Sequence, residues 1–384
     1  MSSLFERLLA TPEVMEALGE RRFVEAMLRF EAALARAQAS VGLIPPEAAL
    51  SIIGTCKVEL FDVLKLVREA GRARCATAPL VKSLRETVGL FNPDAESYVH
   101  FACDDQDLAD TALALVTRDA LDLMTADLSR CIAALLKLAA THASDPVLAR
   151  TALQPASVTT FGLKCSQWAA PLLRAQRRLR VAGDNALSVQ LGGLVGTQAE
   201  MQGKGPQVTA LMAAELKLRA PATPWRTERD EWVALACELA LLVGSLAKMA
   251  QDMVLMAQFE VGELTHTDNT CKVVLAAAQR VPQRLAVLLA SMAQEHEGAL
   301  GHWQAAFAEW PALLMSAHGA TRAMDQALAS LQVHPQRMRS HLDARRAAAP
   351  TREAAAPFAL ELARHAAELT HQHLQTLLNP AVDA

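Results

Sequence analysis

Polar side chains that could bind an anion and move a proton gather in three short segments. Residues 100–107 hold a histidine, three aspartates and a glutamine, and residues 150–154 hold an arginine, a threonine and a glutamine. The guanidinium of Arg150 can fork onto a carboxylate through two parallel hydrogen bonds. Residues 261–272 hold His266, and an unperturbed imidazole titrates near neutral pH. These residue types are able to bind an anion and to move a proton, and His266 is one that could act as a base near neutral pH.

The adjacent acids Asp104 and Asp105 are the least expected feature of these segments. Two carboxylates about 4 Å apart repel by about 4 kcal/mol at an effective dielectric of 20, and an anionic substrate beside them would bind poorly. Three interpretations stay open. The aspartates could be exposed charges that begin a helix and favour its dipole. They could contact a less anionic or cationic substrate, or they could hold a divalent metal ion.

Structural alternatives exist for the other candidates as well. His266 and Asn269 stand in a polar turn, which suits an exposed loop as well as a catalytic residue. Cys271 and Lys272 follow in the same segment and are weaker candidates for the base. Arg150 could instead satisfy free carbonyl groups at a helix end.

Long helices are predicted to position these segments. No Gly or Pro occurs between Asp110 and Pro146, and apolar residues recur at three- and four-residue steps. This pattern predicts a helix of roughly 30 residues, about 45 Å long. No run alternates as a strand would, and no internal repeat is found. Further helices are predicted at residues 20–40, 46–53, 58–71, 161–182, 228–260 and 275–297. The predicted class is all-α, with an N-terminal helical domain (1–108), a central long-helix bundle (109–333) and a small C-terminal helical domain (334–384).

Composition narrows the class of protein further. Hydrophobic residues make up 52% of the chain and aromatic residues only 4%, which favours close helix packing. The net charge of −4 and the absence of a basic block with aromatics argue against a nucleic-acid partner. Seven scattered cysteines predict reduced thiols in a cytoplasmic protein. Charged residues interrupt the longest apolar run, 232–264, and the chain starts without an apolar stretch, so we expect no membrane span and no secretory signal.

Several strings resemble the fumarase/aspartase superfamily, and most closely its 3-carboxy-cis,cis-muconate cycloisomerase branch. The resemblance covers nearly the whole chain. The matching strings, in the family's order, are residues 27–37, 190–197, 224–230, 294–297 with 303–305, and 335–339.

The resemblance implies a three-domain, all-α fold with a central bundle of long helices. It also implies a homotetramer, in which each active site combines regions from three subunits. The expected substrate is a small carboxylate, and the expected chemistry is addition or elimination next to that carboxylate. In the cycloisomerase branch a carboxylate of the substrate itself adds across a double bond and forms a lactone. The resemblance implies neither a cofactor nor a metal.

The first two segments resemble two of the family's active-site regions. His100, Gln106 and Asp107 match the pattern H-[WF]-G-x-T-S-Q-D, but Asp104 and Asp105 stand in place of its Thr-Ser pair. The second segment, RTALQPA, resembles G-R-T-x-x-Q-x-A, and its alanine in place of a histidine fits the cycloisomerase branch. The substrate-binding residues that the resemblance implies are His100, Asp104, Asp105, Gln106, Arg150, Thr151, Gln154 and Asn269.

The third segment departs most from the family, whose loop follows G-S-S-x-M-P-x-K-x-N-P. His266 and Asn269 align with the family string P-H-K-R-N-P, but the serine base and the lysine clamp have no counterpart. About ten residues upstream of His266 are deleted relative to the family. His266 is therefore the predicted catalytic residue, and Asn269 would orient the substrate.

Three functional hypotheses follow from this departure. The first is a lactonising cycloisomerase with a rearranged site, acting on a muconate-like acid whose substituent is conserved or altered, as in a sulfonate. The second is a lyase of the same superfamily acting on a different, less anionic substrate. The third is a catalytically inactive paralogue with a structural or assembly role.

Overall fold

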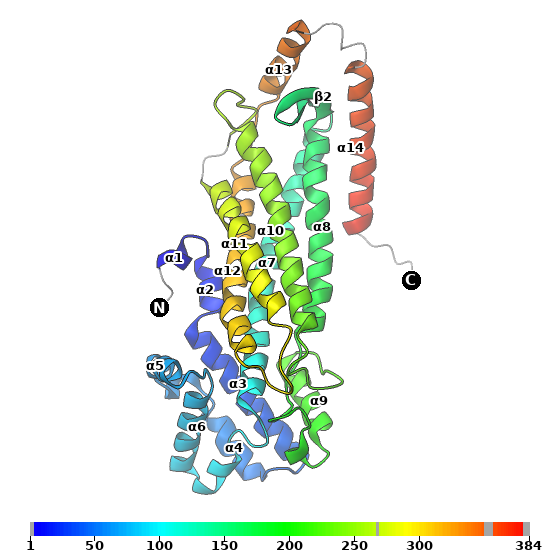
Figure 1. Ribbon diagram of the computed structural model, residues 1–384. Coiled ribbons are helices and arrows are strands. Elements are labelled where there is room, and N and C mark those ends of the chain that lie inside the picture. The colour runs from blue at the N-terminus through cyan, green and yellow to red at the C-terminus, as the bar shows by residue number, and fades with distance from the viewer. Residues whose placement is uncertain (1–3, 266–268, 349–355, 379–384) are drawn as a thin grey trace.

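Long helices run side by side through the centre of the computed structural model (Figure 1). The structure describes residues 4–265, 269–348 and 356–378. In chain order the elements are α1 (Leu4–Arg7), α2 (Pro12–Ala17), α3 (Glu20–Ser40), α4 (Pro46–Thr55), η1 (Val58–Leu60), α5 (Val63–Ala73), α6 (Ala78–Phe91), η2 (Pro93–Tyr98), α7 (Asp105–Thr141), β1 (Pro146–Thr151), β2 (Gln154–Thr160), α8 (Phe161–Ala186), η3 (Ala199–Met201), α9 (Gly205–Leu216), α10 (Asp230–Met256), β3 (Leu264–Thr265), α11 (Thr270–Ala290), α12 (His302–Ala329), β4 (Gln332–Val333), α13 (Pro335–Ala348) and α14 (Ala356–Leu378).

The bundle consists of α7, α8, α10, α11 and α12, which pack along their lengths. Helices α4, α5, α6 and α9 lie around one end of it, whereas β2 and α13 lie at the other end (Figure 1). The buried residues of the bundle helices are mainly Leu, Ala, Val and Met, and they form one continuous apolar core with α3. The predicted all-α fold with a long-helix core is therefore confirmed.

Helix α7 separates the first two polar segments by its whole length. It has 37 residues, so at 1.5 Å per residue it is about 55 Å long. Residues 100–107 are at its start, and the hairpin that carries Arg150 follows its end. The helix starts earlier than the predicted Asp110 because Asp104 and Asp107 form a capping box around its first turn.

Two short antiparallel sheets correct the prediction that the chain has no strands. Strands β1 and β2 form a hairpin whose two turn residues, Ala152 and Leu153, have φ of 49° and 60°. Two successive positive φ values match the backbone twist of a tight hairpin turn, although neither residue is glycine. Most of β2 is exposed, so the sequence lacks the alternation that marks a half-buried strand. Strands β3 and β4 pair through only two residues each.

Helices α10 and α11 are, by length and composition alone, apolar enough to cross a membrane. Half of the most apolar window of α10 is buried inside the structure, and 22% of that of α11. Both helices pack in the bundle, against each other and against α12. The helix predicted at residues 228–260 therefore packs in the bundle, with Asp230 and Met256 as its ends.

Candidate active site

The histidine of the first segment is held by a buried glutamate. His100 Nδ1 lies 2.5 Å from Oε1 of Glu31 on α3, and their side chains are 8% and 1% exposed. Burial lowers the pKa of His100, but the charge and hydrogen bond of Glu31, together with Asp105 and Asp107, outweigh burial and raise the pKa above its ordinary value. Its Nε2 is buried and has no partner among the described residues. His100 therefore presents a free N–H donor on a ring that favours the charged state.

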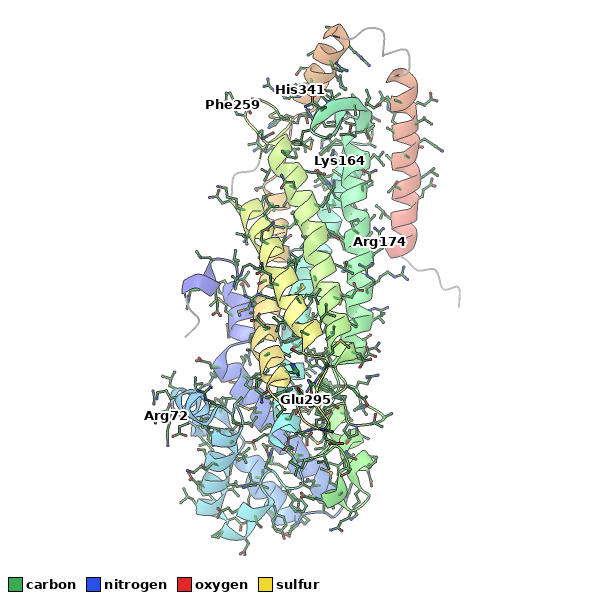
Figure 2. All side chains as sticks on the ribbon, in the orientation of Figure 1. Arg72, Lys164, Arg174, Phe259, Glu295 and His341 are labelled. Carbon is green, nitrogen blue, oxygen red and sulfur yellow. The ribbon has the colours of Figure 1, made fainter. Side chains whose placement is uncertain are left out.

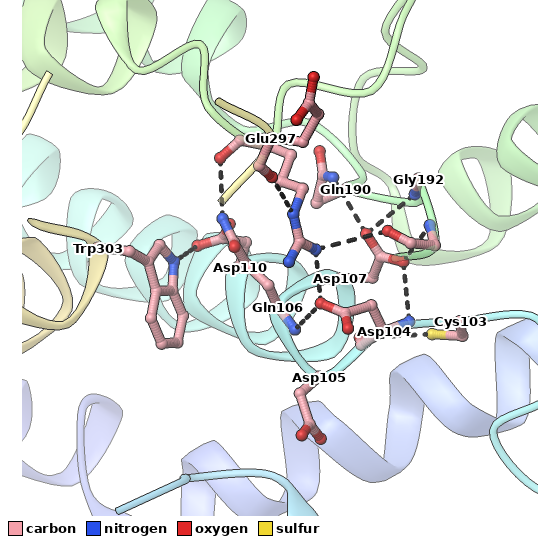
Figure 3. A network of polar contacts seen from close by, with 12 residues as sticks. Cys103, Asp104, Asp105, Gln106, Asp107, Asp110, Gln190, Gly192, Glu297 and Trp303 are labelled. Atoms are coloured by element: carbon pink, nitrogen blue, oxygen red, sulfur yellow. Dashed lines mark hydrogen bonds and ion pairs between the residues drawn. The ribbon is translucent and has the colours of Figure 1, made fainter. Parts of the chain in front are cut away.

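The two adjacent aspartates of this segment point in different directions. Asp104 caps α7, accepting from the backbone N–H of Gln106, and its Oδ2 lies 2.5 Å from Nη1 of Arg226. Asp105 accepts from the hydroxyl of Thr77 at 2.6 Å and is directed away from the network around Asp104 (Figure 3). The interpretation as helix-start charges therefore describes the structure, and Arg226 neutralises the carboxylate that faces inward.

Asp107 is the most enclosed acid of the segment. Its carboxylate accepts from the backbone N–H groups of Gly192 and Gly193, at 2.9 and 2.8 Å, and from the side-chain amide of Gln190 at 3.0 Å (Figure 3). Burial raises the pKa of Asp107 to about 6, although these donors pull it down. The glycine-rich string at residues 192–196 thus cradles a carboxylate. Asp107 fixes the start of α7 and is enclosed by protein groups.

Gln106 and Asp110 tie the start of α7 to the end of the bundle. The Gln106 amide donates to the carbonyl of Arg226 at 2.8 Å and to Asp110 at 3.2 Å. Asp110 also accepts from Arg229 at 2.7 Å and from the indole of Trp303 at 2.9 Å. The amide predicted to bind substrate therefore uses its donors inside the chain.

A cavity of about 460 Å³ opens beside His100. Its wall combines Lys82 and Arg85 of α6 with four acids, Glu86, Glu96, Asp104 and Asp105. Acids outnumber cations here, so within one chain only Lys82 and Arg85 attract an anionic group to the His100 ring. The guanidinium of Arg85 is held to the carbonyl of Val99, at 3.2 Å from Nη2.

The arginine of the second segment is also held by a buried glutamate. Arg150 Nη1 and Nη2 donate to the two carboxylate oxygens of Glu263, at 3.0 and 2.8 Å, and Glu263 is fully buried. Nη1 also donates to the carbonyl of Leu148 at 3.3 Å. The predicted alternative, an arginine that satisfies a helix end, is therefore not what the structure shows.

The Arg150 guanidinium keeps one edge for a ligand. An arginine has five N–H donors, and Glu263 and Leu148 leave the edge formed by Nε and Nη2 unused. Thr151 and Gln154 pair across the hairpin turn, and both are exposed. The second segment therefore offers a half-exposed cation and two polar side chains at one place.

Glu263 also binds a histidine from the C-terminal part of the chain. His341 on α13 places Nδ1 2.8 Å from Oε1 of Glu263, the same oxygen that accepts from Arg150 Nη2. Figure 2 shows His341 at the same end of the bundle as Lys164, far from Glu295. Arg150, Glu263 and His341 thus form one cluster, which joins the second and third segments.

The third segment lies partly outside the described residues. His266, the predicted base, falls in the part that the structure does not describe. Asn269 is exposed and precedes α11, but its side chain does not cap the helix. Cys271 is buried, which raises the pKa of its thiol and disfavours the thiolate, and Lys272 is exposed. Residues 261–263 stand where the family has its serine pair, and the carboxylate of Glu263 accepts hydrogen bonds on both of its oxygens.

Known proteins share both this fold and much of this sequence. A family model described as lyase matches residues 6–272. The 3-carboxy-cis,cis-muconate cycloisomerase of Bradyrhizobium diazoefficiens is 38% identical over 360 residues, which cover 90% of this chain and 80% of that protein. The chain belongs to the lyase family of the fumarase/aspartase superfamily.

Two further comparisons extend the likeness of this lyase. Nitrosuccinate lyase of Streptomyces davaonensis is 36% identical over 370 residues, covering 89% of this chain and 77% of that protein. The crystal structure of 3-carboxy-cis,cis-muconate lactonizing enzyme from Pseudomonas putida superposes with a TM-score of 0.87 at 35% identity. That superposition covers 98% of this chain and 90% of the other. Relatives named for different activities thus resemble this chain over most of its length.

The residues that sequence reasoning missed in this lyase are the partners of the predicted ones. Glu31, Arg226, Glu263 and His341 hold His100, Asp104 and Arg150 in place, but each lies far away in the sequence. Glu31 is an acid on the buried, apolar side of a predicted helix, and this signal could have been recognised. For His341 the sequence around it offers no such signal.

Proposed function

We propose that this lyase is a lactonising enzyme of the 3-carboxy-cis,cis-muconate cycloisomerase type, acting on a muconate-type di- or tricarboxylate. The observation that carries the proposal is an arrangement found twice: a buried glutamate holds a cation and leaves it a free donor. Glu31 holds His100 in this way, and Glu263 holds Arg150. Each free donor can bind one carboxylate of the substrate. Four relatives named 3-carboxy-cis,cis-muconate cycloisomerase, 34–38% identical to this chain, support the choice of substrate.

The proposed reaction needs a proton donor and fixed cations. A carboxylate oxygen of the substrate bonds to one alkene carbon, and the neighbouring alkene carbon takes a proton. Before the proton arrives, negative charge collects on the carboxylate attached to that second carbon, and donors already in place stabilise it. His100 and Arg150 would supply those donors. The step moves one proton and no hydride, so it calls for no redox cofactor.

We further propose that these two cations meet in one site only when several copies assemble, as in the homotetramer implied by the family resemblance. Within one chain α7 separates His100 from Arg150 by about 55 Å, given 1.5 Å per residue. No substrate of this size bridges that distance. A second copy must therefore bring its hairpin to the start of the first copy's α7. We also place the protein in the cytoplasm, which suits its seven free cysteines.

Loss of ultraviolet absorbance tests the activity, because lactone formation shortens the conjugated system of 3-carboxymuconate. We expect turnover by the purified protein and a 10- to 150-fold lower kcat/KM for Arg150→Lys, as charged hydrogen bonds contribute about 1.5–3 kcal/mol. Arg174→Lys, a change at an exposed arginine of α8, is the control and should behave as the wild type. A folded wild-type protein that leaves the absorbance unchanged would reject the proposed function.

Mixing two variants tests the shared site. His100→Ala and Arg150→Ala should each be inactive, and unfolding and reassembling them together should restore part of the activity, since some sites then receive both intact residues. Mixtures as inactive as their components would contradict a site shared between copies.

An inactive paralogue is the second candidate function, and the third segment favours it. Its described residues hold no serine, and its lysine, Lys272, is exposed on α11. This candidate predicts no turnover alone and co-purification with an active homologue. A less anionic substrate is favoured by one observation: Asp105, Glu86 and Glu96 line the cavity beside His100, although Arg226 neutralises Asp104.

A further inference from the structure

The proposed reaction lacks an assigned proton-transfer group at the Arg150 end of the bundle, where the family's loop serine has no counterpart. Glu263 is the nearest acid, but both of its oxygens accept charged hydrogen bonds and its side chain is fully buried. Lys164 lies at the same end, where burial lowers its pKa, and its Nζ lies 3.9 Å from Oδ2 of Asp252. Among the described residues, the remaining titratable group in contact with the cluster is His341.

The position of His341 is fixed through Glu263 in two ways. The backbone carbonyl of Glu263 accepts from the backbone N–H of His334, at 3.0 Å, just before α13 begins. Thr265 on β3 places its hydroxyl 2.7 Å from Nε2 of His334, and β3 pairs with β4. The side chain of Glu263 then binds His341 two turns further along α13. The imidazole of His341 and the start of α13 are thus both anchored to Glu263.

The carboxylate of Glu263 also selects the tautomer of His341. An ionised carboxylate only accepts hydrogen bonds, so Nδ1 of His341 must carry the proton that it donates. In the neutral ring this leaves the lone pair on Nε2, which has no partner among the described residues. The side chain is 23% exposed, so Nε2 can reach a ligand. A carboxylate that orients an imidazole in this way is the arrangement of general bases in hydrolases.

The surroundings of His341 suit an anionic substrate. Arg150 on β1 shares oxygen Oε1 of Glu263 with the imidazole, so its free edge lies beside the ring. Lys164 on α8 is near enough to feel the charges of both Glu263 and Arg150. On α13 itself, Arg337 and Arg345 stand one turn before and one turn after His341. Arg150 of β1 therefore lies beside the ring, Lys164 of α8 is close to its partners Glu263 and Arg150, and Glu263 is the acid among the described residues that contacts it.

We propose that His341 is the catalytic acid–base residue that takes the place of the loop serine, with Glu263 as its positioning residue; this rests on the proposed function. In the lactonising direction the substrate carboxylate forms the C–O bond, and the alkene electron pair moves onto the neighbouring carbon and its carboxylate, which Arg150 binds. The Nε2–H of protonated His341 then gives its proton to that carbon, and the N–H electron pair stays on nitrogen. In the reverse direction neutral Nε2 removes the same proton.

Replacing the histidine tests the catalytic role. We expect His341→Gln to lower kcat 100- to 10,000-fold, the range for general acid–base groups, with KM changed less than threefold. Added imidazole should restore part of the activity to His341→Gly, which separates a lost base from a damaged fold. His302→Gln removes a half-exposed histidine at the other end of the bundle and should leave kcat unchanged. Circular dichroism checks that each variant is folded.

The outcomes separate this inference from the proposed function. Near wild-type turnover by His341→Gln, together with an inactive His266→Gln, would assign the base to His266 and overturn the role of His341. A folded wild-type protein without turnover on muconates would overturn the function and this role together. Nitrogen NMR tests the positioning role of Glu263: the Nδ1–H tautomer of neutral His341 should dominate in the wild type and mix with Nε2–H in Glu263→Gln. An unchanged tautomer in that variant would remove Glu263 as the positioning residue.

Discussion

Replacing Glu263 by glutamine should loosen one end of the bundle while the rest stays folded. The carboxylate accepts three charged hydrogen bonds, two from Arg150 and one from His341, and it is fully buried. Glutamine keeps the shape but turns one acceptor into a donor that faces other donors. Breaking a buried charged pair costs about 3–5 kcal/mol, and we expect about 3 kcal/mol because Arg150 can partly turn to water. The side chain of Arg150 is 29% exposed.

Hydrogen exchange measured by mass spectrometry detects where in the chain Glu263→Gln lowers local stability. Since 1.36 kcal/mol is a factor of ten, a loss of about 3 kcal/mol should make exchange in β1, β2 and α13 on the order of 100-fold faster. The middle of α7 should keep its protection, because its core contacts are unchanged.

An exposed pair supplies the matched control. Glu69→Gln removes the partner of Lys65, whose Nζ is 3.9 Å away on the surface of α5, and should change exchange by less than a few fold. If Glu263→Gln changed exchange in the hairpin no more than this control, Glu263 would not be the anchor of Arg150 and α13.

Two further predictions concern the start of α7. Asp104→Ala removes a helix cap, worth about 1 kcal/mol, and the ion-pair partner of Arg226. The unfolding midpoint of this variant should therefore fall clearly below that of Asp105→Ala. Equal midpoints would contradict the role of Asp104 as a cap. Asp107 should titrate near pH 6 in carbon NMR of its carboxyl group, and a midpoint below 4.5 would refute its burial. Because its folded pKa lies above the ordinary 3.8, the contribution of Asp107 to stability is present below pH 4 and lost as the pH rises through about 6.

Sequence reasoning located the long helices and the polar segments well, because both depend on local patterns. The capping pair Asp104 and Asp107 moved the start of α7, and the exposed hairpin was missed because its strands carry no alternating pattern. Contacts between distant residues were beyond reach. Arg150 and His341 are 191 positions apart, yet one oxygen of Glu263 binds both, and no spacing rule in a single sequence links them.

The roles predicted for the site residues depend in the same way on contacts that the sequence does not reveal. Gln106 was expected to bind substrate from its place in a motif, but its amide donates to Arg226 and Asp110. His100, Arg150, Thr151 and Gln154 keep free polar groups, so their predicted roles stay predictions. Asn269 is exposed before α11, and His266 lies outside the described residues.

The length of α7 also bears on how such a protein can change during evolution. A substitution near Asp104 and one near Arg150 are separated by the whole helix, so within one chain their effects on folding should simply add. Selection can therefore act on each end separately. If sites are shared between copies as proposed, one copy could lose its loop after a gene duplication while its opposite end continued to serve a sister chain. A partly eroded sequence on an intact scaffold is then a stable outcome and not merely a stage on the way to loss.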